Sequence, residues 1–130
     1  MPSLSLKNWV VRKTSLNADC LSKQENELSV ELGFSTGLPK DENRTCSVVS
    51  KLKVKANNSE DFFSVKLLAI FSFTNPEEQN LSDDRKNEIL KTEAFPVAYE
   101  LLCDYVKKFL GAANLKEITM PLFDDIKSSL

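Results

Sequence analysis

The chain has 130 residues, of which 42% are hydrophobic and 28% charged, and its formal net charge is −2. A chain of this length fits a single domain, residues 1–130, that can bury about two thirds of its unfolded surface without a metal or a disulfide. The small net charge excludes an overall field that would steer the molecule toward nucleic acid, and no apolar run approaches the roughly 20 residues needed for membrane insertion.

The first predicted strand contains an irregularity. Leu4 and Leu6 are apolar at one phase of a two-residue alternation, and Trp9 and Val11 follow at the opposite phase. One strand keeps all four side chains on the same face only if an extra residue is inserted between the two pairs. The pattern therefore predicts a strand with a bulge near Lys7-Asn8.

Strict alternation predicts the second and third strands. Apolar and polar residues alternate over 28–35, which is typical of a strand with one buried and one solvated face. The alternation resumes over 46–56, where a lysine row stands opposite the apolar side chains. Turn-forming residues at 38–43 and 57–61 are expected to connect the strands. The lysine row consists of Lys51, Lys53 and Lys55.

A fourth strand is predicted at 62–73, and its second face is unusual. One face is fully apolar, whereas the other combines polar residues with Leu68 and Ile70. A half-apolar face is expected to be partly covered, and a second copy of the chain is the simplest cover.

The second half is dominated by a predicted amphipathic helix. A short first piece is expected over Ser82–Thr92, with Ser82 as its N-cap. Pro96 then interrupts it, because proline clashes with the preceding turn. The main helix is therefore placed over Phe95–Leu110, with Gly111 as its C-terminal cap. Its apolar stripe consists of Phe95, Tyr99, Leu102, Val106 and Phe109.

The apolar stripe is expected to lie in the core, or in a core that continues into a subunit interface. After the helix, residues 115–122 are predicted to be extended, and Phe123–Leu130 to form a short terminal helix. The residues predicted at an oligomer interface are Tyr99, Leu102, Val106, Phe109, Leu68 and Ile70.

No catalytic machinery is evident. The chain has no histidine, which removes the commonest base at neutral pH, and its three glycines are too isolated to form a phosphate-binding loop. The adjacent acids Asp83-Asp84 and Asp124-Asp125 are typical of helix caps or solvated residues rather than of a catalytic pair. We therefore expect neither an enzyme nor a cofactor.

The cysteines indicate a reducing compartment. Cys20, Cys46 and Cys103 are odd in number, far apart and without a C-x-x-C pair, which argues against a disulfide framework and against a zinc site. The first residues show no basic segment followed by an apolar one, so no signal peptide is expected. We interpret the chain as cytoplasmic, with reduced thiols.

The lysine row has two interpretations. It could contact nucleic acid, but no aromatic residues are interleaved for base stacking and the chain as a whole is acidic. The favoured interpretation is a solvated strand face that also discourages edge pairing. No nucleic-acid partner is therefore expected.

Several short motifs, taken in chain order, form a recognisable set. Residues 4–18 look like the first strand of one known family. Residues 69–73 look like the end of that family's fourth strand. Phe95–Glu100 is similar to that family's phenylalanine-proline opening of its long helix. The run 115–126, including Phe123-Asp124, looks like its crossover into the last helix. Together these motifs resemble the bacterial export chaperone SecB.

The resemblance implies an α+β fold, in which a long helix and a short C-terminal helix pack on one face of a four-stranded antiparallel sheet. It also implies a tetramer built as a dimer of dimers, with the long helices buried between the dimers. The implied activity is ATP-independent holding of unfolded polypeptides along apolar grooves. Apolar burial suits that activity because it is non-directional and demands no single client sequence.

The crossing segment should then lie over the sheet edge and form part of a groove. The alternative is that the same residues only close the chain's own core. The predicted peptide-binding residues are Phe34, Ile118, Met120, Leu122 and Phe123.

The chain departs from the export members of that family. Lys13, Asn17 and Ser64 stand where those members carry acidic residues for docking the motor SecA, and Lys66 with the lysine row would make this face basic. No cysteine-rich zinc tail is present in the sequence. Coupling to SecA is therefore doubtful, and a specialised SecB-like chaperone, such as one that guards an antitoxin, fits better.

Two functions from different classes follow. The first is a holding chaperone for non-native polypeptides. The alternative is an assembly or adaptor protein that uses the same fold for one dedicated partner. An enzyme or small-ligand binder remains a third class, which a closed pocket with converging polar groups would favour.

Overall fold

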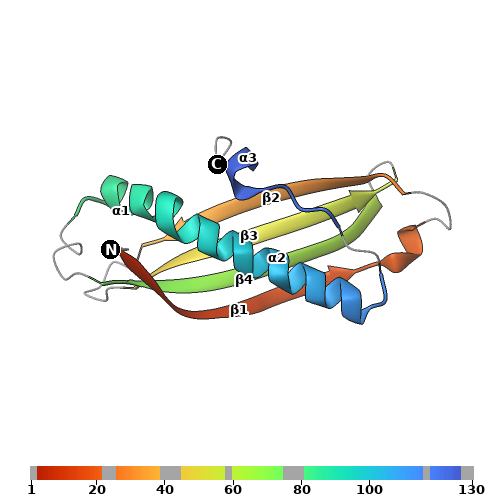
Figure 1. The fold of residues 1–130 in the computed structure, drawn as a ribbon, viewed down its shortest axis with the longest axis horizontal. Helices are drawn as coiled ribbons and strands as arrows, with labels where there is room; N and C mark the ends of the chain where they lie inside the picture. Colours follow the sequence, from red (N-terminus) through yellow and green to blue (C-terminus); the bar gives the residue numbers. More distant parts are fainter. Residues whose placement is uncertain are drawn as a thin grey trace.

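Four strands form one antiparallel sheet in the computed structural model, which describes residues 3–21, 26–38, 45–57, 60–74, 81–115 and 118–126. The strand order across the sheet is β1-β4-β3-β2 (Figure 1), so β1 and β2 are edge strands and β3 and β4 lie between them. The strands are β1 (Leu4–Leu16), β2 (Leu28–Gly37), β3 (Thr45–Ala56) and β4 (Glu60–Phe73).

Helices cover one face of this sheet. In Figure 1 the long helix, made of α1 (Asp83–Ile89) and α2 (Phe95–Ala112), lies diagonally across the strands, and the short α3 (Phe123–Ile126) lies beyond β2. We call the helix-covered side the inner face and the opposite side the outer face. The predicted α+β architecture is confirmed.

Two bulges keep β1 in phase with the core. The pairing of β1 with β4 shifts between Leu6 and Asn8 and again between Val11 and Lys13. The first shift is the predicted bulge, and the second goes beyond the prediction. Because each bulge inserts one residue, the strand returns its apolar side chains to the inner face after each shift. The residues of β1 that pair with inner-face residues of β4 are Leu4, Leu6, Trp9, Val11, Thr14 and Leu16.

The long helix is continuous over 30 residues, so the predicted interruption at Pro96 is wrong. Between α1 and α2, residues Leu90–Ala94 form a π-helical turn in which the N–H of Phe95 donates to the carbonyl of Leu90. A π turn contains an extra residue, which changes the position of the carbonyls that face the proline ring. The clash that would end an α-helix at Pro96 is thereby avoided.

The helix does not end at the predicted cap. Gly111 is helical, the helix continues to Ala112, and Asn114 adopts the left-handed conformation with φ of 59°. The N–H of Leu115 donates to the carbonyl of Leu110 at 2.9 Å, and that of Asn114 to Gly111 at 3.1 Å. This pair of bonds is the Schellman motif, which asparagine tolerates because its side chain suits the left-handed region.

Polar contacts hold the helix over β1. Glu93 Oε1 accepts hydrogen bonds from the backbone N–H groups of Ser3, at 2.6 Å, and Leu4, at 3.3 Å. Near the other end of the strand, the hydroxyls of Thr14 and Tyr105 lie 2.7 Å apart. These contacts join residues about ninety positions apart in the chain and fix the angle at which the helix crosses the sheet.

The core lies between the inner face and the long helix. Full burial of a leucine, valine or phenylalanine side chain contributes about 1.5–3 kcal/mol, so this layer is the main source of stability. The largest fully buried side chains of the sheet are Phe63, Phe71, Leu52, Leu67, Val48 and Val54, and those of the helix are Leu90, Leu102, Leu110 and Val106.

One polar side chain in this core is unsatisfied. Ser50 on β3 is fully buried, and its Oγ has no hydrogen-bond partner among the described residues. An unpaired buried hydroxyl costs about 1–3 kcal/mol, so Ser50→Ala is expected to raise the free energy of unfolding by about 1 kcal/mol. Urea denaturation checks this, with the exposed Ser29→Ala as a control that should change it by less than about 0.5 kcal/mol. A destabilised Ser50→Ala would contradict the assignment.

Some predicted features lie partly outside the described residues. Of the turn predicted at 38–43, only Leu38 is among the described residues. Residues 58–59 of the connection predicted at 57–61 lie outside them, as do residues 127–130 of the predicted terminal helix. The predicted N-cap is confirmed, because Ser82 Oγ accepts a hydrogen bond from the N–H of Arg85 at 3.2 Å.

Candidate functional site

The tail after α2 returns across the inner face. From the Schellman turn it runs without regular structure through residues 118–122 and reaches α3 beyond β2 (Figure 1). Ile118, Met120 and Phe123 are half-buried against the core. The predicted crossing segment is therefore present and lies near the β2 edge of the sheet.

Four aromatic rings join the tail to the helix and to β2. Phe34 of β2 stacks on Phe95 of α2 with ring centroids 4.7 Å apart and planes inclined by 17°. Phe34 also meets Tyr99 edge-on at 6.4 Å, and Tyr99 contacts Phe123 of α3 at 6.0 Å. Such pairs contribute about 0.5–1.5 kcal/mol beyond their burial. We call this set the aromatic junction.

Tyr99 also holds the tail through its hydroxyl. The Tyr99 hydroxyl donates a hydrogen bond of 2.5 Å to the carbonyl of Pro121. Burial, together with a hydrogen bond to Cys103, raises the pKa of Tyr99 well above its usual value, so the hydroxyl keeps its proton and remains a donor. The residue is therefore the point at which helix and tail are connected.

A cavity of about 570 Å³ opens beside the aromatic junction. It lies between the π-helical turn with the start of α2 on one side and the tail with α3 on the other. Leu122 projects into this region with 73% of its surface exposed, the largest value among the exposed large hydrophobic side chains of the described chain. The lining residues are Lys91, Thr92, Pro96, Leu122, Phe123 and Asp124.

The structure brings the predicted peptide-binding residues together only in part. Leu122 and Phe123 line the cavity, whereas Phe34 does not line it and belongs to the aromatic junction through its contacts with Phe95 and Tyr99. Ile118 and Met120 precede them on the tail and pack against the core without lining this cavity. Whether any of these residues binds a peptide stays a prediction.

Sequence reasoning missed the helix side of the cavity. The sequence pattern singles out the Phe95-Pro96 pair as a motif but does not predict that Lys91, Thr92 and Pro96 line a cavity. The π-helical turn places this segment against the cavity, and no periodicity of apolar residues signals a π turn.

The residues predicted at an oligomer interface occupy two different environments. Tyr99, Leu102 and Val106 are buried within the chain's own core. Phe109 is half-buried and packs on Phe63 at 5.4 Å. In contrast, the strand residues of the set, Leu68 and Ile70, lie on the outer face and remain partly exposed. Self-association remains a prediction, and on this chain it depends on surfaces other than the buried stripe.

Groups suited to chemistry are few. Within the described ranges, no set of three or more histidine, cysteine, aspartate or glutamate side chains is placed to hold a metal ion. The three cysteines are free, and burial raises the pKa of Cys46 to about 11 and also raises that of Cys103. Protonated thiols are weak nucleophiles at neutral pH. None of the helices in the described part of the chain has the length and apolar character to cross a membrane.

Comparisons with known proteins give a match in fold. No protein-family model and no curated protein matches the chain. Its structure is similar to that of the SecB-like chaperone Rv1957 of Mycobacterium tuberculosis, solved with a ChAD peptide from the HigA1 antitoxin, with a TM-score of 0.71 and 11% identity. That likeness covers 92% of this chain and 87% of the other.

A second solved structure, a protein of unknown function from Streptococcus agalactiae, gives a TM-score of only 0.42 at 12% identity over 92% of this chain and 97% of that one. The first likeness confirms the predicted SecB-like fold.

Proposed function

We propose that this chain, whose fold is SecB-like, is an ATP-independent holding chaperone for unfolded or partly folded polypeptides. The observation that carries the proposal is Leu122, an exposed leucine beside an apolar cavity at the aromatic junction. A side chain of this kind offers apolar burial to a client without prescribing the client's sequence.

The proposal extends to the setting of the protein. We place it in the cytoplasm, as a single domain over residues 1–130 that assembles as a dimer of dimers. The SecB-like neighbour was solved with an antitoxin peptide, which supports a specialised client of that kind. Coupling to SecA is not part of the proposal, because Lys13, Asn17 and Ser64 are not acidic.

Leu122→Asp is expected to weaken client holding about tenfold, because it replaces the exposed apolar contact by a charge. The measurement is suppression of light scattering when two unrelated, chemically unfolded proteins are diluted into buffer with the chaperone. The amount needed for half-maximal suppression should rise for both clients.

Leu28→Asp provides the matched control, since Leu28 is an exposed leucine at the start of β2 that does not line the cavity beside Leu122. It should behave like the unmodified chain. Absence of suppression by the unmodified chain at several-fold excess would refute the holding function. Binding of one client only, with the other ignored, would instead favour a dedicated adaptor.

A further inference from the structure

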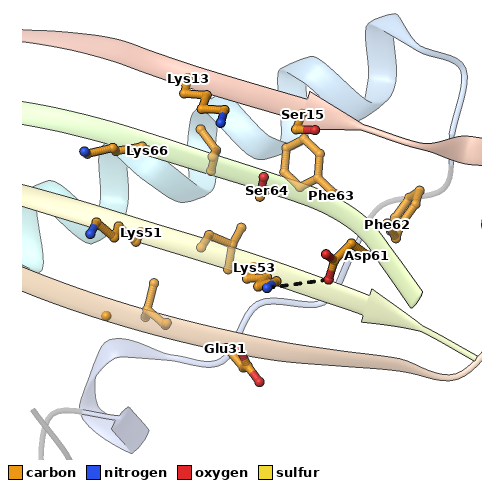
Figure 2. A pocket seen from close by; sticks show the side chains of 14 residues that line it. Lys13, Ser15, Glu31, Lys51, Lys53, Asp61, Phe62, Phe63, Ser64 and Lys66 are labelled. Atoms are coloured by element: carbon orange, nitrogen blue, oxygen red, sulfur yellow. Dashed lines mark ion pairs between the residues drawn. The ribbon is translucent and has the colours of Figure 1, made fainter. Parts of the chain in front are cut away.

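Three lysines on neighbouring strands form a second row, which crosses the middle of the outer face and differs from the row along β3. It consists of Lys13, Lys66 and Lys51. Lys13 of β1 pairs with Lys66 of β4, and Lys66 pairs with Lys51 of β3. Residues that pair directly in a sheet point to the same face, with Cβ atoms about 4.5–5.5 Å apart. Figure 2 shows these side chains on three neighbouring strands, with the helices behind the sheet. The fourth position of the row, on β2, is Gly33, which pairs with Lys51.

The charges of this row are not neutralised within the described chain. No carboxylate of the described residues forms an ion pair with Lys13, Lys51 or Lys66, whereas the two acids of the region are already engaged. Asp61 lies 3.6 Å from Lys53, and Glu31 lies 3.9 Å from Lys55. Like charges placed directly opposite each other destabilise a sheet, so the row opposes the stability of the fold that carries it.

Edge protection, the interpretation favoured from the sequence for Lys51, Lys53 and Lys55, does not explain these lysines, which all lie on β3. β3 and β4 are the two internal strands, so their backbone groups are already paired on both sides. Edge protection therefore does not account for Lys51, Lys53 or Lys55, and that part of the interpretation is wrong.

The row stands in a hollow that is basic in an acidic protein. A cavity of about 550 Å³ is lined by Lys13, Lys51, Lys53 and Lys66 and by the acids Glu31 and Asp61, a local charge of +2 from four lysines and two acids. The whole chain carries −2. Gly33 leaves the floor of the hollow open, because a Cβ added there would meet nothing within 4 Å.

An apolar row runs beside Lys13, Lys66 and Lys51 on the same face. Val10 pairs with Leu68, and Leu68 pairs with Val49. Val10 is 48% exposed, and Leu68 and Val49 are partly exposed. A ligand that covers both rows therefore has to present negative charge next to apolar side chains.

We propose that the outer face docks an acidic polypeptide segment that also carries apolar side chains. Carboxylates complement Lys13, Lys66 and Lys51, and apolar side chains complement the row of Val10, Leu68 and Val49. Nucleic acid fits less well, because the aromatic residues of the hollow, Phe62 and Phe63, are buried and offer no ring for stacking. The proposal is independent of client holding, which concerns the inner face.

The test uses a fluorescent synthetic peptide in which glutamates alternate with valines, and follows its anisotropy as the full chain is added. Replacing its glutamates by glutamine or by lysine should abolish binding, and replacing its valines by serine should weaken it. Affinity should fall as salt is raised, because exposed charge pairs are screened. A single-stranded oligonucleotide serves as the competing anion, and its binding in preference to the peptide would overturn the proposal.

Three variants separate this surface from the rest of the molecule. Lys51→Glu with Lys66→Glu should lower peptide affinity at least about tenfold, because two attractions become repulsions. Gly33→Glu should also lower peptide affinity, because it places a carboxylate across from Lys51. The substitution does not strain the backbone, because φ at Gly33 is not positive. Lys107→Glu, at an exposed position on α2, is the matched control and should bind normally.

Circular dichroism shows whether each variant is folded, and the client-holding assay should be unchanged in all three. Equal peptide affinity in Gly33→Glu and in the unmodified chain would refute the docking surface, even if the double lysine variant failed to fold.

Discussion

Leu102→Ala is expected to lower the free energy of unfolding by about 2–5 kcal/mol. Leu102 is fully buried on α2, where it faces the sheet. Its truncation to alanine leaves a cavity in the close-packed core, and the surrounding side chains can fill this cavity only partly. Because small proteins have about 5–15 kcal/mol of stability in total, the loss is a large fraction of it. Chemical denaturation followed by circular dichroism gives the value.

Leu122→Ala is the matched control for this variant. The same atoms are removed from a side chain that is 73% exposed, so the expected change is below about 0.5 kcal/mol. Equal effects at the two positions would mean that the apolar stripe of the helix is not the core of this chain, and would return Leu102 to the set of interface candidates.

Tyr99→Ala is expected to destabilise the protein by about 3–5 kcal/mol and to release the tail. The substitution removes the ring contacts with Phe34 and Phe123 and the hydrogen bond to the carbonyl of Pro121. Tyr99→Phe keeps the ring and loses only the hydrogen bond, so it should lower stability by about 0.5–1.5 kcal/mol.

Hydrogen exchange of the backbone amide of Asp125, which donates to the carbonyl of Leu122 at 3.0 Å, tests release of the tail directly. Its protection should be lost in Tyr99→Ala and largely kept in Tyr99→Phe. If the two variants lost protection equally, the hydrogen bond to Pro121 rather than the aromatic junction would be holding the tail.

The two faces of the sheet serve different chemistry in this scheme. The inner face provides the core and, at its β2 edge, the cavity beside Leu122, where the client of the proposed chaperone would make apolar contacts. The outer face combines charge with apolar surface, which favours a partner of defined composition. A chaperone with both surfaces can hold a client on one side while a different segment docks on the other.

The candidate site was predictable only in outline. The short tail motifs located Leu122 and Phe123, but the residues that contact them or line the cavity with them include residues of the long helix, more than twenty positions earlier in the chain. The hydroxyl contact of Tyr99 with the carbonyl of Pro121 has no signature in the sequence, because a backbone carbonyl looks the same at every residue.

The amino-acid sequence by itself determined the strands, the first bulge and the amphipathic helix, because these follow from periodicity and composition over neighbouring residues. Only the tertiary structure decided the path through Pro96, the cap at Asn114 and the internal position of β3. It also decided which lysines meet across the sheet: Lys13, Lys66 and Lys51 share one row because of strand order and two bulges. Such contacts join residues distant in the chain, and local pattern carries no record of them.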